Sequence, residues 1–125
     1  MAWNDPRPMS PHLQVYKLPL TAKLSILHRA TGAVLFIGLI LMVFILLSAA
    51  NGNDSWQSMH AFLSSFFGKF VLFGFTFSLY YHLCNGIRHL FWDIGKGLDL
   101  ECANKSGITV LAVSIFLTLL TWIVA

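Results

Sequence analysis

Three stretches of the chain contain no Asp, Glu, Lys or Arg, and polar segments separate them from one another. They cover residues 30–53, 70–87 and 106–125, and each is close to the ~20 residues with which an α-helix crosses the ~30 Å core of a bilayer. Strict two-residue alternation of apolar side chains, the mark of a transmembrane strand, is absent, and three crossings cannot close a barrel. The pattern therefore predicts an all-α integral membrane fold with three transmembrane helices.

Proline, glycine and polar residues indicate where these helices begin and end within a single domain of residues 1–125. Thr21 suits a helix cap after Pro19, and the run Asn-Gly-Asn-Asp after residue 50 favours a turn. Four prolines punctuate the first 19 residues, so this segment is either an extended docking strap or a frayed tail. We expect an extended cytoplasmic strap at 1–20, transmembrane helices at 21–50, 61–93 and 106–125, and a cytoplasmic loop at 94–105.

The composition agrees with a membrane protein, because 57% of the residues are hydrophobic and only 10% are charged. The basic residues that flank the first span and the second connection are Arg7, Lys17, Lys23, Arg29, Arg88, Lys96 and Lys105. The first connection, near residues 51–60, has none, so the positive-inside bias predicts a cytoplasmic N-terminus and a periplasmic C-terminus. The pI of about 9.1 then reports topology, and we expect no nucleic-acid partner.

His82 lies within the second apolar stretch, where an imidazole without a partner is costly. Gly74, Ser78, His82 and Gly86 recur every four residues and share one helix face, which suits either a packing groove or a flat porphyrin beside an axial imidazole. A metal ion and a proton relay are further alternatives. One histidine supplies one axial position, so a bis-histidine haem requires a second chain or a second histidine here.

Other polar residues gather at the predicted inner edge of the membrane. His28 and His89 suit hydrogen bonds to carboxylates at that edge, or to water. Ser25 and Arg29 are four residues apart on one helix face, where they suit a quinone carbonyl, a haem propionate or, for the arginine, a plain topological anchor. Arg88 is expected to join a polar cluster at the headgroup level.

Two long motifs carry a resemblance to a known family. The first runs from R-P-M-S-P-H-L at 7–13 to S-I-L-H-R-A-T at 25–31, and the second is H-L-C-N-G-I-R-H-L-F-W-D-I-G at 82–95. Together they resemble the cytochrome b membrane anchors of succinate dehydrogenase, respiratory complex II. The resemblance spans nearly the whole chain, although the apolar parts contribute little specificity to it.

The resemblance implies a role for each matching position. His82 is similar to the axial ligand of haem b, whose second ligand comes from a partner anchor subunit that completes the helical bundle. Ser25 and Arg29 resemble the serine and arginine of the ubiquinone site. His28 and Arg29, together with His89, match positions near the haem propionates.

The family implies a complex with a second small anchor subunit, an iron-sulfur subunit and a flavoprotein, and this chain is not catalytic alone. Asp93 is expected close to the quinone pocket, with no role assigned.

The prolines of residues 1–20 break up any signal core and no transit pattern is present, so we expect a bacterial inner membrane protein, with an organelle-encoded chain as the alternative. The rival functions are a quinol:fumarate reductase anchor and, from another class, a small transporter subunit with an intramembrane histidine site.

Overall fold

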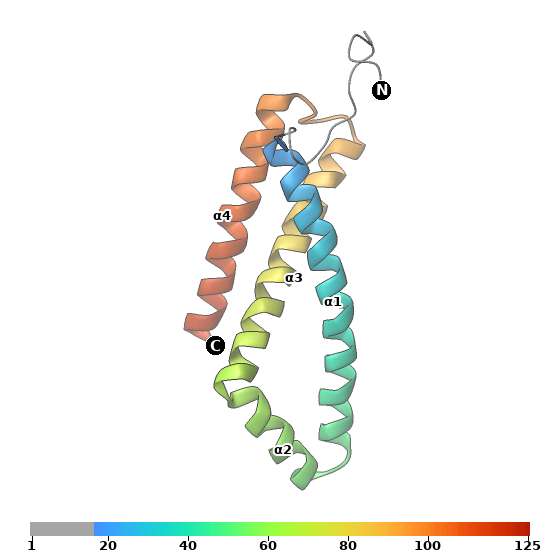
Figure 1. Ribbon diagram of the computed structural model, residues 1–125, viewed down its shortest axis with the longest axis vertical. Coiled ribbons are helices and arrows are strands. Elements are labelled where there is room, and N and C mark those ends of the chain that lie inside the picture. The colour runs from blue at the N-terminus through green and yellow to red at the C-terminus, as the bar shows by residue number, and fades with distance from the viewer. Residues whose placement is uncertain (1–16) are drawn as a thin grey trace, which may run out of the picture.

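The computed structural model describes residues 17–125 and contains four helices in this part of the chain (Figure 1). They are α1 (Leu20–Ala50), α2 (Asn53–Ser64), α3 (Phe66–Asp93) and α4 (Leu100–Val124). Three of them, α1, α3 and α4, are long and apolar enough to cross a membrane, which agrees with the predicted three-span helical fold. The predicted strap falls almost entirely outside the described residues, as does Arg7.

The second helix differs from its prediction, because 61–93 is two helices with a break at Ser65. The Ser65 backbone is extended, with φ −66° and ψ 163°. Its hydroxyl donates to the Phe62 carbonyl and accepts from the Gly68 amide at 3.1 Å, so it closes one helix and caps the next. A Cβ at Gly68 would collide with the Phe62 carbonyl and the Leu63 backbone, so this corner requires glycine.

The last helix begins at Leu100, within the segment predicted as the loop 94–105. Asp99 caps it through a hydrogen bond from the Cys102 amide at 3.2 Å, and Glu101 pairs with Lys105 one turn on at 2.9 Å. These charged residues stabilise a first turn that extends beyond the uncharged stretch. The prediction placed the start of the helix directly after Lys105, the last charged residue of the chain, and this start was wrong by six residues.

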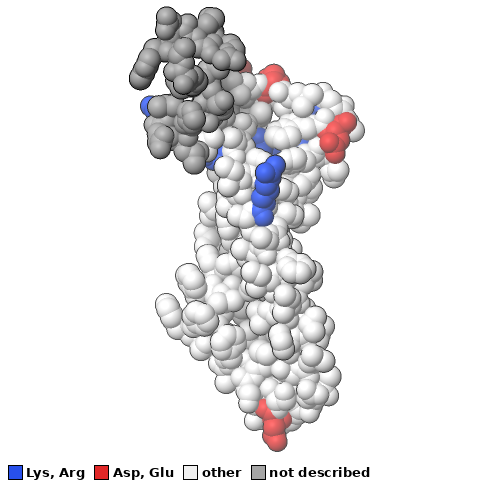
Figure 2. All heavy atoms as spheres, turned by 45° about the vertical axis from the view of Figure 1, so that its right-hand side comes forward, with Lys and Arg blue, Asp and Glu red and all other residues white. Residues whose placement is uncertain are grey.

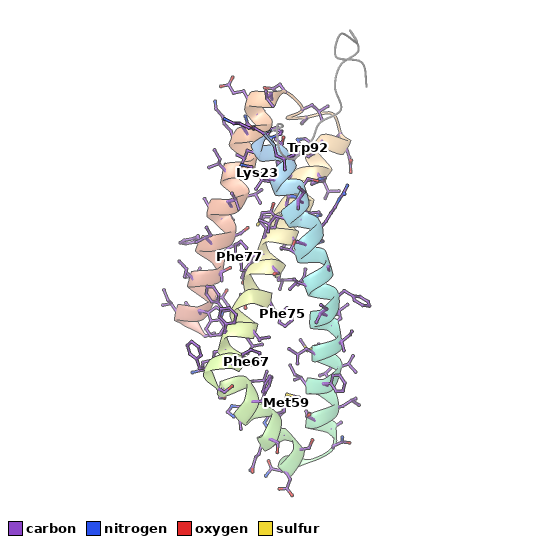
Figure 3. The ribbon with its side chains drawn as sticks, in the orientation of Figure 1. Lys23, Met59, Phe67, Phe75, Phe77 and Trp92 are labelled. Carbon is purple, nitrogen blue, oxygen red and sulfur yellow. The ribbon has the colours of Figure 1, made fainter. Side chains whose placement is uncertain are left out.

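Helix α3 packs against both α1 and α4. Helix α1 also meets α4 near its own start, and it diverges from α3 toward the end that holds α2 (Figure 1). Few buried side chains hold the three long helices together. Leu24 of α1, Tyr81 of α3 and Val110 of α4 form the one core cluster among the described residues. The Phe75 ring projects between α1 and α3, where it meets the position of a Cβ on Gly38 (Figure 3). Most other apolar side chains face outward, as expected for helices that pack against lipid or another subunit.

Charge is distributed unevenly along the bundle. Figure 2 shows Lys and Arg gathered at the end that holds the start of α1 and the loop between α3 and α4. We call this the basic end; it includes Lys23, Lys96 and Lys105. The opposite end carries Asp54 in the first turn of α2. The fold therefore brings the basic flanks of separate helices to one end, as the charge pattern predicted.

Candidate functional site: a histidine cluster between α1 and α3

Three histidine rings lie side by side near the basic end. His28 of α1 stacks on His82 of α3 with ring centroids 4.0 Å apart and planes 4° from parallel. On its other side, His28 contacts His89, with centroids 5.2 Å apart. The sequence separates His82 and His89 by ~10 Å along a helix, and the His28 ring spans that separation.

The hydrogen bonds of His82 determine which of its nitrogens carries the proton. Nδ1 lies 3.2 Å from the His28 carbonyl oxygen and 3.3 Å from the Thr31 hydroxyl, which itself donates to the same carbonyl at 2.8 Å. Because a carbonyl oxygen only accepts, this contact assigns an N–H to Nδ1. In the neutral ring the lone pair is then on Nε2, which forms no hydrogen bond within residues 17–125.

Gly32 lets the His82 ring approach the backbone of α1. A Cβ at this position would lie 3.1 Å from Cε1 of His82, which is closer than an ordinary van der Waals contact. Thr31, the adjacent residue, is buried and provides the hydroxyl described above. One turn of α1 therefore supplies both the polar partners and the space that fix the His82 ring.

The parallel stacking of His28 and His82 allows only one of these two imidazoles to bind a given metal ion. An imidazole lone pair lies in the plane of its ring, so His28 and His82, stacked in parallel, cannot bind opposite sides of one ion. No group of three or more His, Cys, Asp or Glu side chains among residues 17–125 could hold a bare metal ion. The site thus suits a metal whose other ligands come from elsewhere.

The small-residue face of α3 is only partly open. Nothing lies within 4 Å of a Cβ built at Gly74 or Gly86, so the helix surface is free at both positions. Ser78 between them is 6% exposed, however, because the twist of the helix turns it into the packed interface. The predicted face of Gly74, Ser78, His82 and Gly86 is therefore interrupted at Ser78. The open helix surface nearest to His82 is at Gly86.

Ser25 and Arg29 lie on α1 one turn apart, as predicted. The helix turns about 100° per residue, so both lie well away from the direction of the buried Leu24. Ser25 is half-buried and Arg29 is exposed. Neither side chain forms a hydrogen bond or an ion pair within the described residues, so both are available to a ligand or another subunit.

Arg88 differs from the prediction of a polar cluster at the headgroup level. Its side chain is 5% exposed and ties α3 to α4: Nε donates to Ser106, and the terminal nitrogens donate to Asn85 and to the Ala103 carbonyl, all at 2.9–3.0 Å. Asp93 is exposed and does not join it. The sequence could not reveal this burial, because an arginine near a helix end usually faces the headgroups.

Two residues of the site were missed at the sequence level. Tyr81 is fully buried and donates its hydroxyl to the Leu24 carbonyl of α1 at 2.6 Å. Asn85 accepts at its backbone carbonyl from the His89 ring at 2.8 Å. With Arg88, these residues recur at spacings of four and three, a pattern that indicates a buried polar face of a helix.

Two buried polar atoms at this site have no partner among the described residues. They are Nδ1 of His28 and Nδ2 of Asn85. A buried donor without an acceptor costs about 1–3 kcal/mol, so such atoms mark places where a further polar group is expected. Both atoms lie in residues that contact the histidine cluster through ring stacking or hydrogen bonding.

An apolar hollow of about 680 Å³ adjoins this cluster through Gly32 and extends between α1 and α3 toward the opposite end. Its polar contributions are hydroxyl groups, from Thr76, Tyr80 and Thr121, and no Asp, Glu, Lys, Arg or His lines it. The hollow is therefore suited to apolar material.

The chain is similar to known membrane subunits over nearly its whole length. The family model described as "Succinate dehydrogenase/Fumarate reductase transmembrane subunit" matches residues 4–121. The succinate dehydrogenase cytochrome b556 subunit of Rickettsia felis is 43% identical over 117 residues, covering 94% of this chain and 91% of that protein. The subunit of the same name from Paracoccus denitrificans is 43% identical over 118 residues, with the same coverage. The cytochrome b560 subunit from Reclinomonas americana is 38% identical over 127 residues, covering 97% and 88%.

Proposed function

This chain belongs to the succinate dehydrogenase/fumarate reductase transmembrane subunit family, as a cytochrome b anchor of succinate dehydrogenase, and from this we propose that His82 binds the iron of haem b. The family resemblance drawn from the two sequence motifs is thereby confirmed. The role in complex II is that of a multi-pass membrane subunit. Which residues bind haem and quinone, and how the chain is oriented, are our proposals.

The observation that carries the haem assignment is the hydrogen bonding of His82. Histidines that bind metals commonly donate the other ring N–H to a carbonyl or carboxylate, which fixes the tautomer and raises the basicity of the ligand nitrogen. Here Nδ1 donates toward the His28 carbonyl and the Thr31 hydroxyl, which leaves the Nε2 lone pair for iron. The open surface at Gly86, one turn away, gives space for a flat ring.

Haem b, when bound, would supply a one-electron redox centre. His82 would hold its iron, and the parallel His28 ring is not oriented to bind the same iron. We therefore assign the second ligand to a histidine of a second small anchor subunit. His28, whose buried Nδ1 lacks a partner in the described chain, and the nearby Arg29 and His89 suit hydrogen bonds to the haem propionates.

The haem assignment is tested by the reduced-minus-oxidised visible spectrum of membranes that contain the assembled complex. We expect His82→Leu to lose or strongly shift the b-type bands, because leucine has no lone pair for iron. His60→Leu is the matched control, since His60 is exposed on α2 at the opposite end. Unchanged b-type bands in the His82 variant would show that another residue binds the iron.

We assign the ubiquinone contacts to Ser25 and Arg29. A hydroxyl donor and a fixed cation, four residues apart with no partners in the described chain, suit a quinone carbonyl and its partly anionic reduced forms. Both lie at the basic end, where an iron-sulfur subunit and a flavoprotein would deliver electrons from succinate if that end is cytoplasmic. The quinone is then reduced at a site to which this chain contributes one side.

Ser25→Ala and Arg29→Leu test this assignment. We expect each to lower succinate-driven ubiquinone reduction by 10- to 100-fold, because hydrogen bonds to a charged group contribute about 1.5–3 kcal/mol. Succinate oxidation by an artificial acceptor should stay nearly intact. Lys23→Leu removes a neighbouring exposed cation and is the control for a general charge effect. Equal loss of both activities in the Ser25 and Arg29 variants would indicate failed assembly and would leave no support for quinone contacts.

The orientation and the location of the chain are also proposals, and they rest on the distribution of basic residues. We propose that the basic end is cytoplasmic in a bacterial inner membrane, according to the positive-inside bias. Quinol:fumarate reduction, the reverse chemistry, remains the alternative direction, since it uses the same types of site. The family match does not support the transporter alternative, because the relatives are subunits of succinate dehydrogenase.

A further inference from the structure

A second hollow lies between α3 and α4 at the basic end. Its volume is about 520 Å³, and all its lining residues belong to α3, α4 or the loop that joins them. No residue of α1 lines it, and none of the three histidines does, although the lining residue Trp92 packs against His89 with ring centroids 4.8 Å apart. Neither the haem nor the quinone assignment gives it a role.

Cations and apolar side chains occupy different levels of this hollow. At the basic end it is lined by Trp92 of α3, Lys96 of the loop and Lys105 of α4. Deeper in the bundle it is lined by Cys84 and Val110. The nine residues from Cys84 to Trp92 span ~12 Å along α3. The hollow is therefore amphipathic along the helix axes, with its basic part at the level of the headgroups.

Arg88 lies between these two levels and brings a buried positive charge. Its hydrogen-bond acceptors are all neutral, and no carboxylate lies within ion-pairing distance of it among residues 17–125. Its guanidinium lies 4.2 Å from the centroid of the Trp92 ring, a cation–π contact that stabilises the charge without neutralising it. A buried cation without a counterion is costly, so an anion is expected nearby.

The remaining charges leave the hollow positive. Lys105 is paired with Glu101, but both side chains are about three-quarters exposed, so this pair is weak. Lys96 forms no ion pair within the described chain. Asp93 and Asp99 do not line the hollow.

We propose that this hollow binds an anionic glycerophospholipid, with the phosphodiester near Arg88 and Lys96 and an acyl chain along the apolar part. A cleft of this volume suits a small molecule or a lipid chain rather than a protein helix. Basic pockets between transmembrane helices on the cytoplasmic side are typical sites for acidic headgroups. The apolar lining distinguishes a lipid from a free phosphate, which would use only the cations.

The test uses the purified complex of this chain with its partner subunits. The complex is first delipidated and then titrated with phosphatidylglycerol or with phosphatidylcholine, and native mass spectrometry measures how much lipid it retains. Lys96→Gln removes an exposed cation from the hollow, and Thr109→Trp fills its apolar part. Lys69→Gln, in the first turn of α3 at the opposite end, removes the same charge and is the matched control. Inorganic phosphate is added in a separate series.

We expect the complex to retain phosphatidylglycerol in preference to phosphatidylcholine. Lys96→Gln should weaken that retention about fivefold, the change expected for one cation near an anionic headgroup. Thr109→Trp should weaken it at least as much, while Lys69→Gln leaves it unchanged. Equal retention of the two lipids, an equal loss in Lys69→Gln, or displacement by millimolar phosphate would each overturn the proposal. The haem spectrum should be the same in all three variants, so this test is independent of the haem assignment.

Discussion

Replacing Gly32 with alanine tests whether α1 positions the proposed haem ligand. A Cβ at residue 32 would lie 3.1 Å from Cε1 and 3.7 Å from Nδ1 of His82, whereas ordinary contacts begin near 3.4 Å. The ring must therefore move away from α1 by about 0.3 Å. The His28 ring stacked 4.0 Å away restricts sideways movement.

That small movement acts on the hydrogen bonds of Nδ1. The distances to the His28 carbonyl and the Thr31 hydroxyl are already 3.2 and 3.3 Å, so a further 0.3 Å brings both to the limit of hydrogen bonding. Losing one such bond costs about 1 kcal/mol, which corresponds to about a fivefold change in an equilibrium constant. We expect Gly32→Ala to lower haem occupancy at limiting haem about fivefold and to shift the haem midpoint potential, with the subunits still assembled.

Gly38→Ala is the matched control. Its Cβ would meet the Phe75 ring at 3.1 and 3.2 Å, the same steric conflict between α1 and α3, about 9 Å further along the helix. Haem occupancy is measured by the pyridine haemochrome of purified complex, and the potential by redox titration. If Gly38→Ala lowers both as much as Gly32→Ala, or if Gly32→Ala changes neither, α1 does not position His82 and the reasoning is refuted.

Two further predictions concern the basic end. A periplasmic reporter should be active when fused after Ala125 and inactive when inserted in the loop at Leu98, and the reverse pattern would invert the proposed orientation. Hydrogen bonds from the Cys102 thiol and backbone amide lower the pKa of Asp99, so its capping contribution is present above the ordinary carboxyl pKa of about 4 and is lost as pH falls through the lowered value. Amide protection factors of the first turn of α4 should therefore decrease at acidic pH. The decrease should be smaller in Asp99→Asn, which keeps only the Glu101–Lys105 pair in this turn. A wild-type chain without the decrease would show that the carboxylate does not cap α4.

Several features of the site could be predicted from the sequence because they depend on residues close together in the chain. The three spans follow from runs of uncharged residues, and the isolated His82 stands out because imidazole is rare in such a run. The pair Ser25 and Arg29 follows from helical spacing alone. The break at Ser65 was missed, because one serine among apolar residues carries little signal until its hydroxyl is seen to cap α3.

Contacts between helices could not be predicted in the same way. In a soluble helix the apolar stripe marks the packed face, but a transmembrane helix is apolar on nearly all sides, so its pattern does not show which side meets a neighbour. The stack of His28 on His82 and the burial of Arg88 between α3 and α4 both depend on that choice.

The sequence by itself determined the number of spans, the basic end and the presence of one histidine deep in an apolar helix. Only the tertiary structure decided what that histidine contacts. The His28 carbonyl, Thr31 and Gly32 lie about fifty residues before His82 in the chain, and the packing of α1 against α3 brings them to its ring. Helical periodicity fixes which residues share a face, whereas the depth at which two helices meet depends on close packing between distant segments.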